Sequence, residues 1–277
     1  MKILVVGGDK RQEYLCEYLK AGGANCIHLK TDKDNEMVDS IGDFSVVILP
    51  VPMSSDGEKI FSTDGKLNFS VDKLLSSLKK GQTIMGGRIS EKSKKIINER
   101  CAQYFDLLED DTFVIFNAYL TAQGALRLML QNTQNYITGK NALVTGFGKV
   151  AKAMCSTLNN NGVRVHTCAR NKKDLFLADC FGYGTLTFEQ LKENIEKFDY
   201  IFSTVPAEVI KESHIKSMKK DAVYFELASS PYGARKEYFE KYNKIHVMGN
   251  SLPGRFCAVT WAEKTADYCL NAMRGEG

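Results

Sequence analysis

The chain has 277 residues, of which 44% are hydrophobic, so it is long enough for two domains with sizeable cores. Its net charge of +4 is modest, and the basic excess lies in residues 118–277, which carry 21 basic and 15 acidic side chains. That excess suits an anionic cofactor but is too mild and too scattered to indicate nucleic-acid binding.

Cysteine and histidine usage narrows the class further. The eight cysteines show no C-x-x-C spacing, which argues against a disulfide scaffold and favours a reducing cytoplasm. The four histidines are isolated in the sequence, so no metal site is predicted. The first residues do not resemble a signal peptide, and we find no apolar run approaching the ~18 residues of a membrane span.

Apolar runs alternate with amphipathic stretches along the whole chain, the pattern of an α/β fold with mostly parallel sheets. In the first half we predict strands at Lys2–Val6, Asn25–Leu29, Phe44–Leu49, Thr83–Gly86 and Thr112–Phe116. Helices are predicted at Lys10–Ala21, Ser70–Leu78 and Ser90–Gln103. These elements would form a Rossmann-like substrate or partner domain over residues 1–117.

The second half repeats the pattern after a connecting helix at Thr121–Thr133, with Thr121 as its N-cap. We predict strands at Asn141–Thr145, Val163–Ala169, Tyr200–Thr204, Ala222–Leu227 and Lys244–Met248, and a helix at Lys149–Asn159. A nucleotide-binding domain over residues 118–254 would result. The last helix, Ala258–Met273 in the segment 255–277, should pack back on the first domain.

This order of elements predicts two Rossmann-like, doubly wound parallel-sheet domains. In such an architecture an interdomain cleft lies at the carboxyl ends of the strands, and the loops that follow those strands supply the site.

A glycine turn in the second half carries the strongest motif. The apolar strand Asn141–Thr145 leads into Gly146-Phe147-Gly148-Lys149-Val150-Ala151 and then a helix, the G-x-G-x-x-A form of the dinucleotide-binding fingerprint. Gly146 would make the tight turn, Gly148 would admit a pyrophosphate, and the helix N-terminus would favour the anion. The alternative is a purely structural strand–turn–helix unit.

The end of the next strand indicates which cofactor binds. An NAD site places a carboxylate there for the ribose 2′-OH, whereas this chain has Arg170-Asn171-Lys172. A guanidinium pairs with phosphate, so we predict NADP in preference to NAD. A solvated basic loop is the alternative. The backbone of Thr204-Val205-Pro206, which follows a further strand, should lie alongside the nicotinamide ring of the cofactor.

Candidate substrate residues lie in other loops at strand ends. Arg11, Arg88 and Arg255 would together suit a small substrate with more than one carboxylate. The loop N–H groups near Ser229 are a further candidate. For proton transfer we name Asp56 and Glu226, although either could simply cap a loop, and the acid–base residue stays unassigned.

Short motifs along the chain resemble one family. They are Gly7-Gly8-Asp9-x-Arg11-Gln12, Ile48-Leu49-Pro50-Val51, Asn117 followed by Thr121-Ala122-x-Gly124, Glu226-Leu227-Ala228-Ser229-x-Pro231-x-Gly233, and Leu252-Pro253-Gly254 with Lys264-Thr265-Ala266. The combination resembles the A-subunit family of dipicolinate synthases. The second domain alone is similar to the cofactor domain of alanine and 2-hydroxyacid dehydrogenases.

The resemblance implies oxidation of dihydrodipicolinate to dipicolinate (pyridine-2,6-dicarboxylate) with NADP. It also implies that the partner is the flavoprotein-like B-subunit of dipicolinate synthase, and that the place of action is the mother-cell cytoplasm of a spore-forming bacterium. The chain departs from the family's usual residues at Leu120, Gln123 and Glu226, where Pro, Glu and Asp are usual.

Two other functions stay open. One is a two-domain dehydrogenase that acts on a 2-oxo or 2-amino acid. The predicted cleft loops contain no histidine, which counts against this function. The other is a non-enzymatic NADP-binding subunit. The sequence does not fix the oligomeric state, and a homo-oligomer is one of the states that it leaves open.

Overall fold

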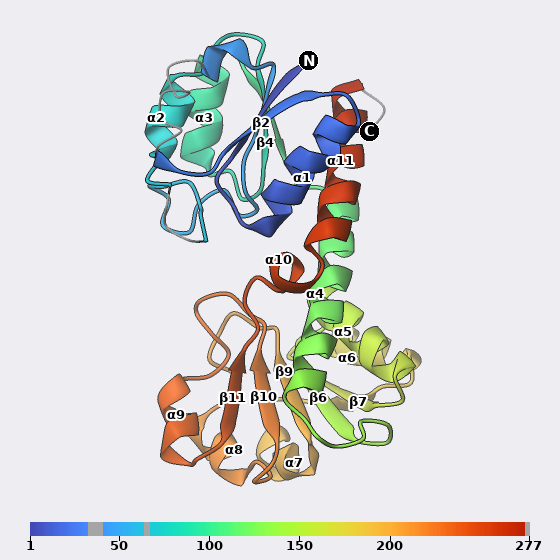
Figure 1. Cartoon of the computed structure of the whole chain (residues 1–277). Coiled ribbons are helices and arrows are strands. Elements are labelled where there is room, and N and C mark those ends of the chain that lie inside the picture. The colour runs from blue at the N-terminus through green and yellow to red at the C-terminus, as the bar shows by residue number, and fades with distance from the viewer. Residues whose placement is uncertain (33–40, 64–66, 275–277) are drawn as a thin grey trace. The chain divides into compact units, whose positions relative to one another are not determined.

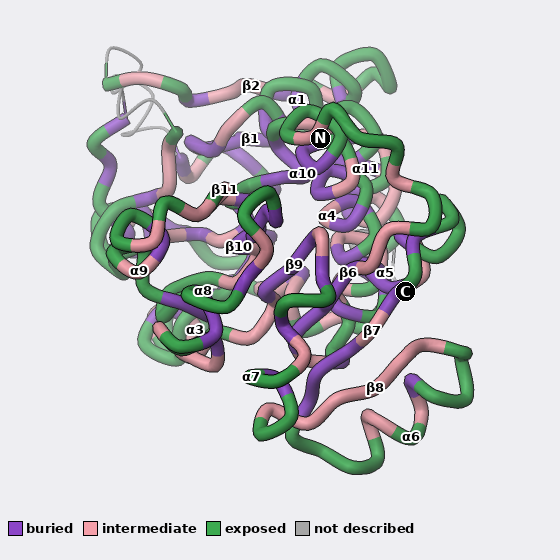
Figure 2. The backbone as a smooth tube through the Cα atoms, turned by 90° about the horizontal axis from the view of Figure 1, so that it is seen from below, coloured by how far each residue is buried: buried purple, intermediate pink, exposed green. Residues whose placement is uncertain are grey.

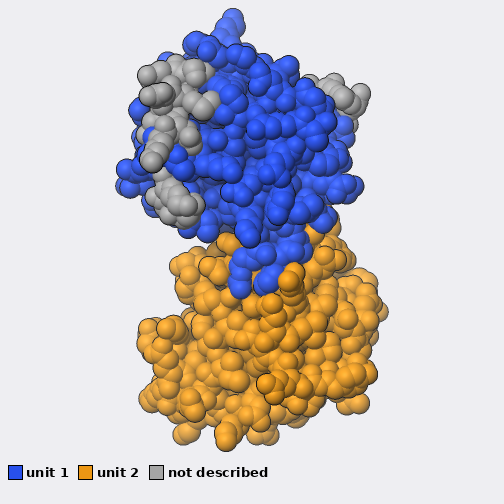
Figure 3. All heavy atoms as spheres, viewed as in Figure 1, with its two compact units in different colours: residues 1–114, 253–277 blue, residues 115–252 orange. Residues whose placement is uncertain are grey.

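The structure, a computed structural model, describes residues 1–32, 41–63 and 67–274. It divides into two compact units (Figure 3): unit 1 comprises residues 1–114 and 253–277, and unit 2 comprises residues 115–252. Each unit holds one parallel β-sheet flanked by helices (Figure 1), so the predicted α/β class is confirmed. Strands at the middle of both sheets are buried along almost their whole length (Figure 2).

Unit 1 is built on a five-stranded sheet of order β2-β1-β3-β4-β5. The strands are β1 (Lys2–Val6), β2 (Asn25–Leu29), β3 (Val46–Ile48), β4 (Thr83–Gly86) and β5 (Gln103–Asp106). The helices are α1 (Lys10–Ala21), α2 (Val71–Ser76) and α3 (Glu91–Glu99). In Figure 1, α2 and α3 cover one face of this sheet, and α1 covers the other together with α11 (Ala258–Arg274).

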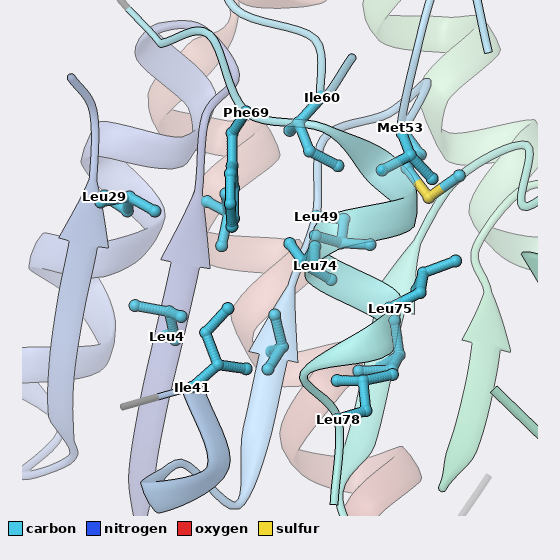
Figure 4. Packing of buried hydrophobic residues seen from close by; sticks show 14 of the residues in the cluster. Leu4, Leu29, Ile41, Leu49, Met53, Ile60, Phe69, Leu74, Leu75 and Leu78 are labelled. Atoms are coloured by element: carbon cyan, nitrogen blue, oxygen red, sulfur yellow. The ribbon is translucent and has the colours of Figure 1, made fainter. Parts of the chain in front are cut away.

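One face of the unit 1 sheet packs into a continuous apolar core. Leu4 and Leu49 of the strand region meet Leu74 and Leu75 of α2, and Phe69 closes the upper side (Figure 4). All five side chains are at most 2% exposed. β1 from Ile3 onward and the whole of β3 are buried at successive residues, and therefore on both faces, as expected for a parallel sheet covered by helices on each face.

The strand predicted at Thr112–Phe116 is wrong. Those residues lie in helix α4 (Asp111–Gln131), and the last strand of the sheet is β5, which begins at the residue where a predicted helix was to end. The run is apolar and β-branched enough to resemble a strand, but the Asp110 carboxylate accepts the Phe113 N–H at 2.7 Å, as a helix cap does. β5 alternates exposed and half-buried residues, so its apolar signal is weak.

Helix α4 also corrects two further expectations. Thr121 is not an N-cap: it lies inside the helix, where its hydroxyl donates to the Asn117 carbonyl at 2.8 Å. By length and composition, α4 is long and apolar enough to cross a membrane, and it is the one such helix in the described part of the chain. The sequence prediction missed this because it began the helix at Thr121. Ala118, Ala122, Ala125 and Met129 are buried at helical spacing, as in a helix packed against protein.

Unit 2 is built on a six-stranded sheet of order β11-β10-β9-β6-β7-β8. The strands are β6 (Asn141–Thr145), β7 (Arg164–Cys168), β8 (Gly184–Leu186), β9 (Tyr200–Ser203), β10 (Val223–Glu226) and β11 (Ile245–Met248). The helices are α5 (Lys149–Asn160), α6 (Lys172–Cys180), α7 (Leu191–Asn194), α8 (Glu212–Ser217) and α9 (Lys236–Lys241), with a 3₁₀ turn at Ile195–Lys197. The order reverses beside β6, so the carboxyl end of β6 is a topological switch point.

The chain returns to unit 1 through α10 (Leu252–Phe256) and α11, which packs against α1 as predicted. Trp261 of α11 is fully buried beside Phe113, with ring centroids 6.1 Å apart. Gly254 lies against the Asp9 carboxylate, and an added Cβ there would overlap it. The glycine of the Leu252-Pro253-Gly254 motif is therefore needed for close packing in unit 1.

Candidate functional site

The glycine turn after β6 has the geometry that a dinucleotide fingerprint needs. Gly146 has φ +80°, a conformation that favours glycine, and an added Cβ would lie 2.9 Å from Val205 Cγ2. Gly148 is the N-cap of α5, and Ala151 in its first turn is fully buried. The strand, turn and helix thus follow each other as the sequence indicates.

Open space and an uncapped helix end coincide at the start of α5. Within the described residues, no side chain caps the N-terminus of this twelve-residue helix. A Cβ added to Gly148 would meet no described atom within 4 Å. An open position in front of the N–H groups at a positive helix end is where an anion is stabilised. The residues present therefore fit the pyrophosphate of a dinucleotide.

Phe147, between the two glycines, is 3% exposed and packs as a core residue. Its ring lies 6.4 Å from the rings of Phe181 and Tyr183, measured between centroids, and Lys152 Nζ lies 5.4 Å from its centre. The side chain is occupied by these contacts. Phe147 can therefore offer a ligand only its backbone.

Threonine hydroxyls fix the turn; Thr204 is one of the predicted cofactor residues, whereas the roles of Thr167 and Thr145 were missed by the sequence analysis. Thr167 Oγ1 donates to the Gly146 carbonyl at 2.8 Å. Thr204 Oγ1 donates to the Thr145 carbonyl at 2.7 Å, while the Thr204 N–H donates to Thr145 Oγ1 at 3.2 Å. This exchange joins the loop Thr204-Val205-Pro206 to the end of β6. A polar residue at the end of an apolar strand was the signal available in the sequence.

The loop after β7 carries the predicted cofactor-selecting residues. Arg170 is exposed, and no acidic residue precedes Asp174 in this loop. Asn171 Oδ1 accepts the Lys173 N–H at 2.9 Å, so this side chain caps α6, and Lys172 is the first residue of that helix. Arg170 lies between the end of β7 and this cap.

Glu226, at the carboxyl end of β10, is 1% exposed and accepts three hydrogen bonds. The Ala228 N–H donates to Oε1 at 3.1 Å, and the Tyr224 hydroxyl and the Gly233 N–H donate to Oε2 at 2.9 and 2.8 Å. Burial raises the pKa of this carboxyl above its ordinary value, and the hydrogen-bond donors around it oppose the rise. The carboxylate is thus engaged entirely by the chain itself.

Asp56, the other predicted proton-transfer candidate, is exposed and closes its own loop. Its Oδ1 accepts the N–H groups of Glu58 and Lys59 at 2.8 and 2.9 Å, and the Ser54 hydroxyl at 3.0 Å. These donors lower the pKa of Asp56 to about 2. A group this acidic is a poor proton acceptor near neutral pH.

The three predicted substrate arginines differ in their surroundings. Arg11 is 4% exposed: its Nε and Nη2 pair with Asp9, and Nη2 also donates to the Val51 carbonyl at 3.1 Å. It is therefore the least available of the three. Arg88 and Arg255 are both exposed. The backbone of Arg88 has a positive φ of 57°, and the Arg255 guanidinium carbon lies 5.0 Å from the centre of the Phe256 ring. Ser229, in unit 2, is also exposed.

A pocket of about 420 Å³ lies elsewhere in unit 2. Its lining includes His166, Gly184 and Phe198, and Asn141 and Gly184 begin their strands. The pocket is thus at the amino ends of the strands, away from the glycine turn. Among residues 1–32, 41–63 and 67–274 no group of three or more His, Cys, Asp or Glu side chains could hold a metal ion.

Two family models match the chain in tandem. Residues 2–108 match the N-terminal domain of the dipicolinate synthase A-subunit, and residues 117–244 match the NAD-binding domain of S-adenosyl-L-homocysteine hydrolase. The second match covers the glycine turn and the loops after β7, β9 and β10. It supports a nicotinamide cofactor.

Full-length relatives agree with the first match. The dipicolinate synthase A-subunit of Bacillus subtilis (strain 168) is 26% identical over 272 residues, covering 92% of this chain and 89% of that protein. The crystal structure of the A-subunit from Bacillus halodurans has a TM-score of 0.82 at 19% identity, over 98% of this chain and 97% of the other.

The fold is also shared with a dehydrogenase. The apo structure of D-lactate dehydrogenase from Escherichia coli has a TM-score of 0.66 at 13% identity, over 100% of this chain and 98% of the other. The chain is therefore an oxidoreductase-like protein with an NAD-binding type domain, similar over nearly its whole length to the A-subunit of dipicolinate synthase, as its sequence motifs indicate.

Proposed function

We propose that this protein oxidises dihydrodipicolinate to dipicolinate with NADP, as the A-subunit of a dipicolinate synthase. The observation that carries the proposal is the open Gly148 position before the N-terminus of α5, which no side chain caps, in a chain whose residues 2–108 match the A-subunit model. In the reaction the dihydropyridine ring loses two hydrogens, one as a hydride and one as a proton, and becomes aromatic.

The cofactor residues follow from the turn. The N–H groups after Gly146 and Gly148, including those of Lys149 and Val150, would bind the pyrophosphate. Arg170 would pair with the 2′-phosphate, with Lys172 adding positive charge. Thr204, Val205 and Pro206 would pass along the nicotinamide, which accepts the hydride when the cofactor is bound.

The substrate carboxylates are assigned to exposed groups. We propose Arg88 and Arg255 as guanidinium partners and the loop N–H groups around Ser229 as further donors. Arg11 would then support the site through Asp9 and Val51. No side chain is assigned to proton removal, because the carboxylates of Asp56 and Glu226 both accept hydrogen bonds from backbone N–H groups of nearby loop residues.

The partner and location rest on the relatives. The Bacillus subtilis relative is named as one component of a synthase, and we propose the B-subunit of dipicolinate synthase as the partner of this chain. We propose the mother-cell cytoplasm of a spore-forming bacterium as its place of action, and the Bacillus origin of the same relative supports this proposal.

The experiment is a direct assay with freshly generated dihydrodipicolinate. NADPH absorbance and the appearance of dipicolinate are followed with NADP or NAD, with and without the B-subunit. The proposal expects NADPH and dipicolinate to form in equal amounts. NADP binding without turnover in either mixture would indicate a non-enzymatic NADP-binding role, and turnover of a 2-oxo or 2-amino acid alone would indicate the other dehydrogenase class.

A further inference from the structure

The backbone of one loop at the carboxyl edge of the unit 2 sheet is pinned at both ends by a single carboxylate. The loop runs from residue 227 to residue 233, between β10 and α9, and its middle residues 229–232 are exposed. Glu226 takes the N–H of Ala228 on one oxygen and that of Gly233 on the other. The span between these two N–H groups is therefore closed by the Glu226 side chain.

Close packing beneath Gly233 holds the same end of the loop. An added Cβ at Gly233 would overlap Ser203 Oγ and lie 3.0 Å from Tyr224 Oη. Tyr224 and Ser203 are fully buried on β10 and β9, and the Tyr224 hydroxyl donates to Glu226. The loop end thus rests on the sheet, with the carboxylate between them.

The anchored end extends to a second loop. The Gly233 carbonyl accepts the N–H groups of Val209 and Ile210 at 3.0 and 2.9 Å. This segment follows Thr204-Val205-Pro206, the loop assigned to the nicotinamide. Glu226 is therefore linked to this second segment through Gly233, whose N–H donates to the carboxylate and whose carbonyl accepts the two N–H groups.

From this geometry we propose that Glu226 is a positioning residue, which fixes the backbone of residues 228–233 and through it the donors around Ser229, without itself contacting substrate. The inference rests on the proposed function for the role of Ser229. Both carboxylate oxygens face donors, so an acceptor-only side chain is required. A glutamine would place an NH₂ group against an N–H or a hydroxyl and lose at least one bond.

The test compares Glu226→Gln with two matched variants. Glu226→Asp keeps the acceptor-only carboxylate, and Tyr224→Phe removes one donor but leaves both loop N–H bonds. Amide exchange at Ala228 and Gly233 is measured by NMR in the absence of substrate. At one or both of these amides we expect exchange about tenfold or more faster in Glu226→Gln, and at both amides exchange within about threefold of wild type in the other two variants, since a hydrogen bond to a charged group is worth about 1.5–3 kcal/mol.

Kinetics then separates positioning from proton transfer. Positioning predicts a rise in KM for dihydrodipicolinate and a fall in kcat of about tenfold in Glu226→Gln, with recovery in Glu226→Asp. Proton transfer by Glu226 predicts a fall in kcat of about 10²–10⁴-fold at unchanged KM, with protected amides, and that pattern would overturn the proposal. If wild type does not turn over dihydrodipicolinate, the proposed function fails, while unchanged amide exchange in Glu226→Gln would be the failure of this inference.

Discussion

Arg11 pairs with Asp9, the residue two positions before it, through two parallel contacts of 2.9 Å between Nε and Oδ1 and between Nη2 and Oδ2. The two side chains are only 5% and 9% exposed, and Asp9 also caps α1 in a capping box with Gln12. On the other side, the guanidinium carbon lies 5.1 Å from the centre of the Trp261 ring. The pair therefore ties the start of α1 to the 50–53 loop and to α11.

We expect Arg11→Ala to destabilise unit 1 by about 3–5 kcal/mol, because it leaves the Asp9 carboxylate buried without its partner. Trp261, the only tryptophan, reports the unfolding of this unit in a urea titration. The control is Lys92→Ala, whose ion pair with Asp72 is 71% and 59% exposed and should contribute at most about 1 kcal/mol. An unchanged midpoint for Arg11→Ala would show that the pair contributes little.

Arg170→Asp should reverse the cofactor preference. Wild type should bind NADP about ten- to a hundredfold more tightly than NAD, because a charge-assisted bond to the 2′-phosphate is worth roughly 1.5–3 kcal/mol. The aspartate repels that phosphate and accepts the 2′-OH. Dissociation constants for both cofactors give the answer, with Arg164→Ala, an exposed arginine at the other end of β7, as control. Equal affinities in wild type would rule out the assignment.

Gly148→Val should abolish NADP binding and leave the fold intact. The new side chain enters space that is open in the protein itself, so the cost to stability should be limited to a poorer N-cap, about 1 kcal/mol. Gly22→Val, at the end of α1 with φ −77°, is a matched control that should bind normally. Binding of NADP to Gly148→Val at wild-type strength would mean that the turn is structural.

The raised pKa of Glu226 determines the direction in which this residue changes the stability of the protein with pH. Between the ordinary value of 4.5 and the raised one, the folded state binds more protons than the unfolded state, so this residue lowers the free energy of unfolding as pH rises. Burial lowers the pKa of His166, His214 and His246, which act in the opposite direction. The difference between wild type and Glu226→Gln isolates the carboxyl.

In urea titrations from pH 4.5 to 8 we therefore expect the stability of wild type relative to Glu226→Gln to fall with rising pH. A relative stability that rises over this range would mean that the three hydrogen bonds outweigh burial and hold the pKa below 4.5.

Arg88→Ala and Arg255→Ala test the substrate contacts. At least one should lose about tenfold or more in kcat/KM for dihydrodipicolinate, because a bidentate guanidinium fixes orientation as well as charge. NADP affinity should be unchanged. Arg100→Ala, an exposed arginine at the end of α3, is the control. Near-normal kinetics in both variants would mean that loop N–H groups, and not these two arginines, bind the substrate carboxylates.

Much of the fold is readable from local sequence. α1, β1, β2, β4 and β6 begin and end at the predicted residues, because caps and glycines mark their ends and their apolar patterns are strong. β5 and β8 are short edge strands with no fully buried residue, so neither has the pattern that identifies a strand. The error at Thr112–Phe116 arises because an apolar run of this length is ambiguous until its cap is known.

The site divides in the same way. The turn at Gly146 and Gly148 is fixed by neighbours in sequence, and its geometry follows the motif. The partner of Arg11 could not be predicted, because a guanidinium beside glycines in sequence is equally suited to a ligand or to the adjacent Asp9. Glu226 meets Gly233 only through the return of a loop, which no local pattern specifies.

Unit 1 is assembled from two stretches of chain separated by the whole of unit 2. A ribosome completes residues 115–252 before it reaches α11, so unit 2 can fold while unit 1 still lacks the helix that covers α1 and buries Trp261. During this interval the side of α1 that α11 will cover still lacks that helix. The completion of unit 1 is therefore a late event in biosynthesis, because it requires the whole of unit 2 to be synthesised first.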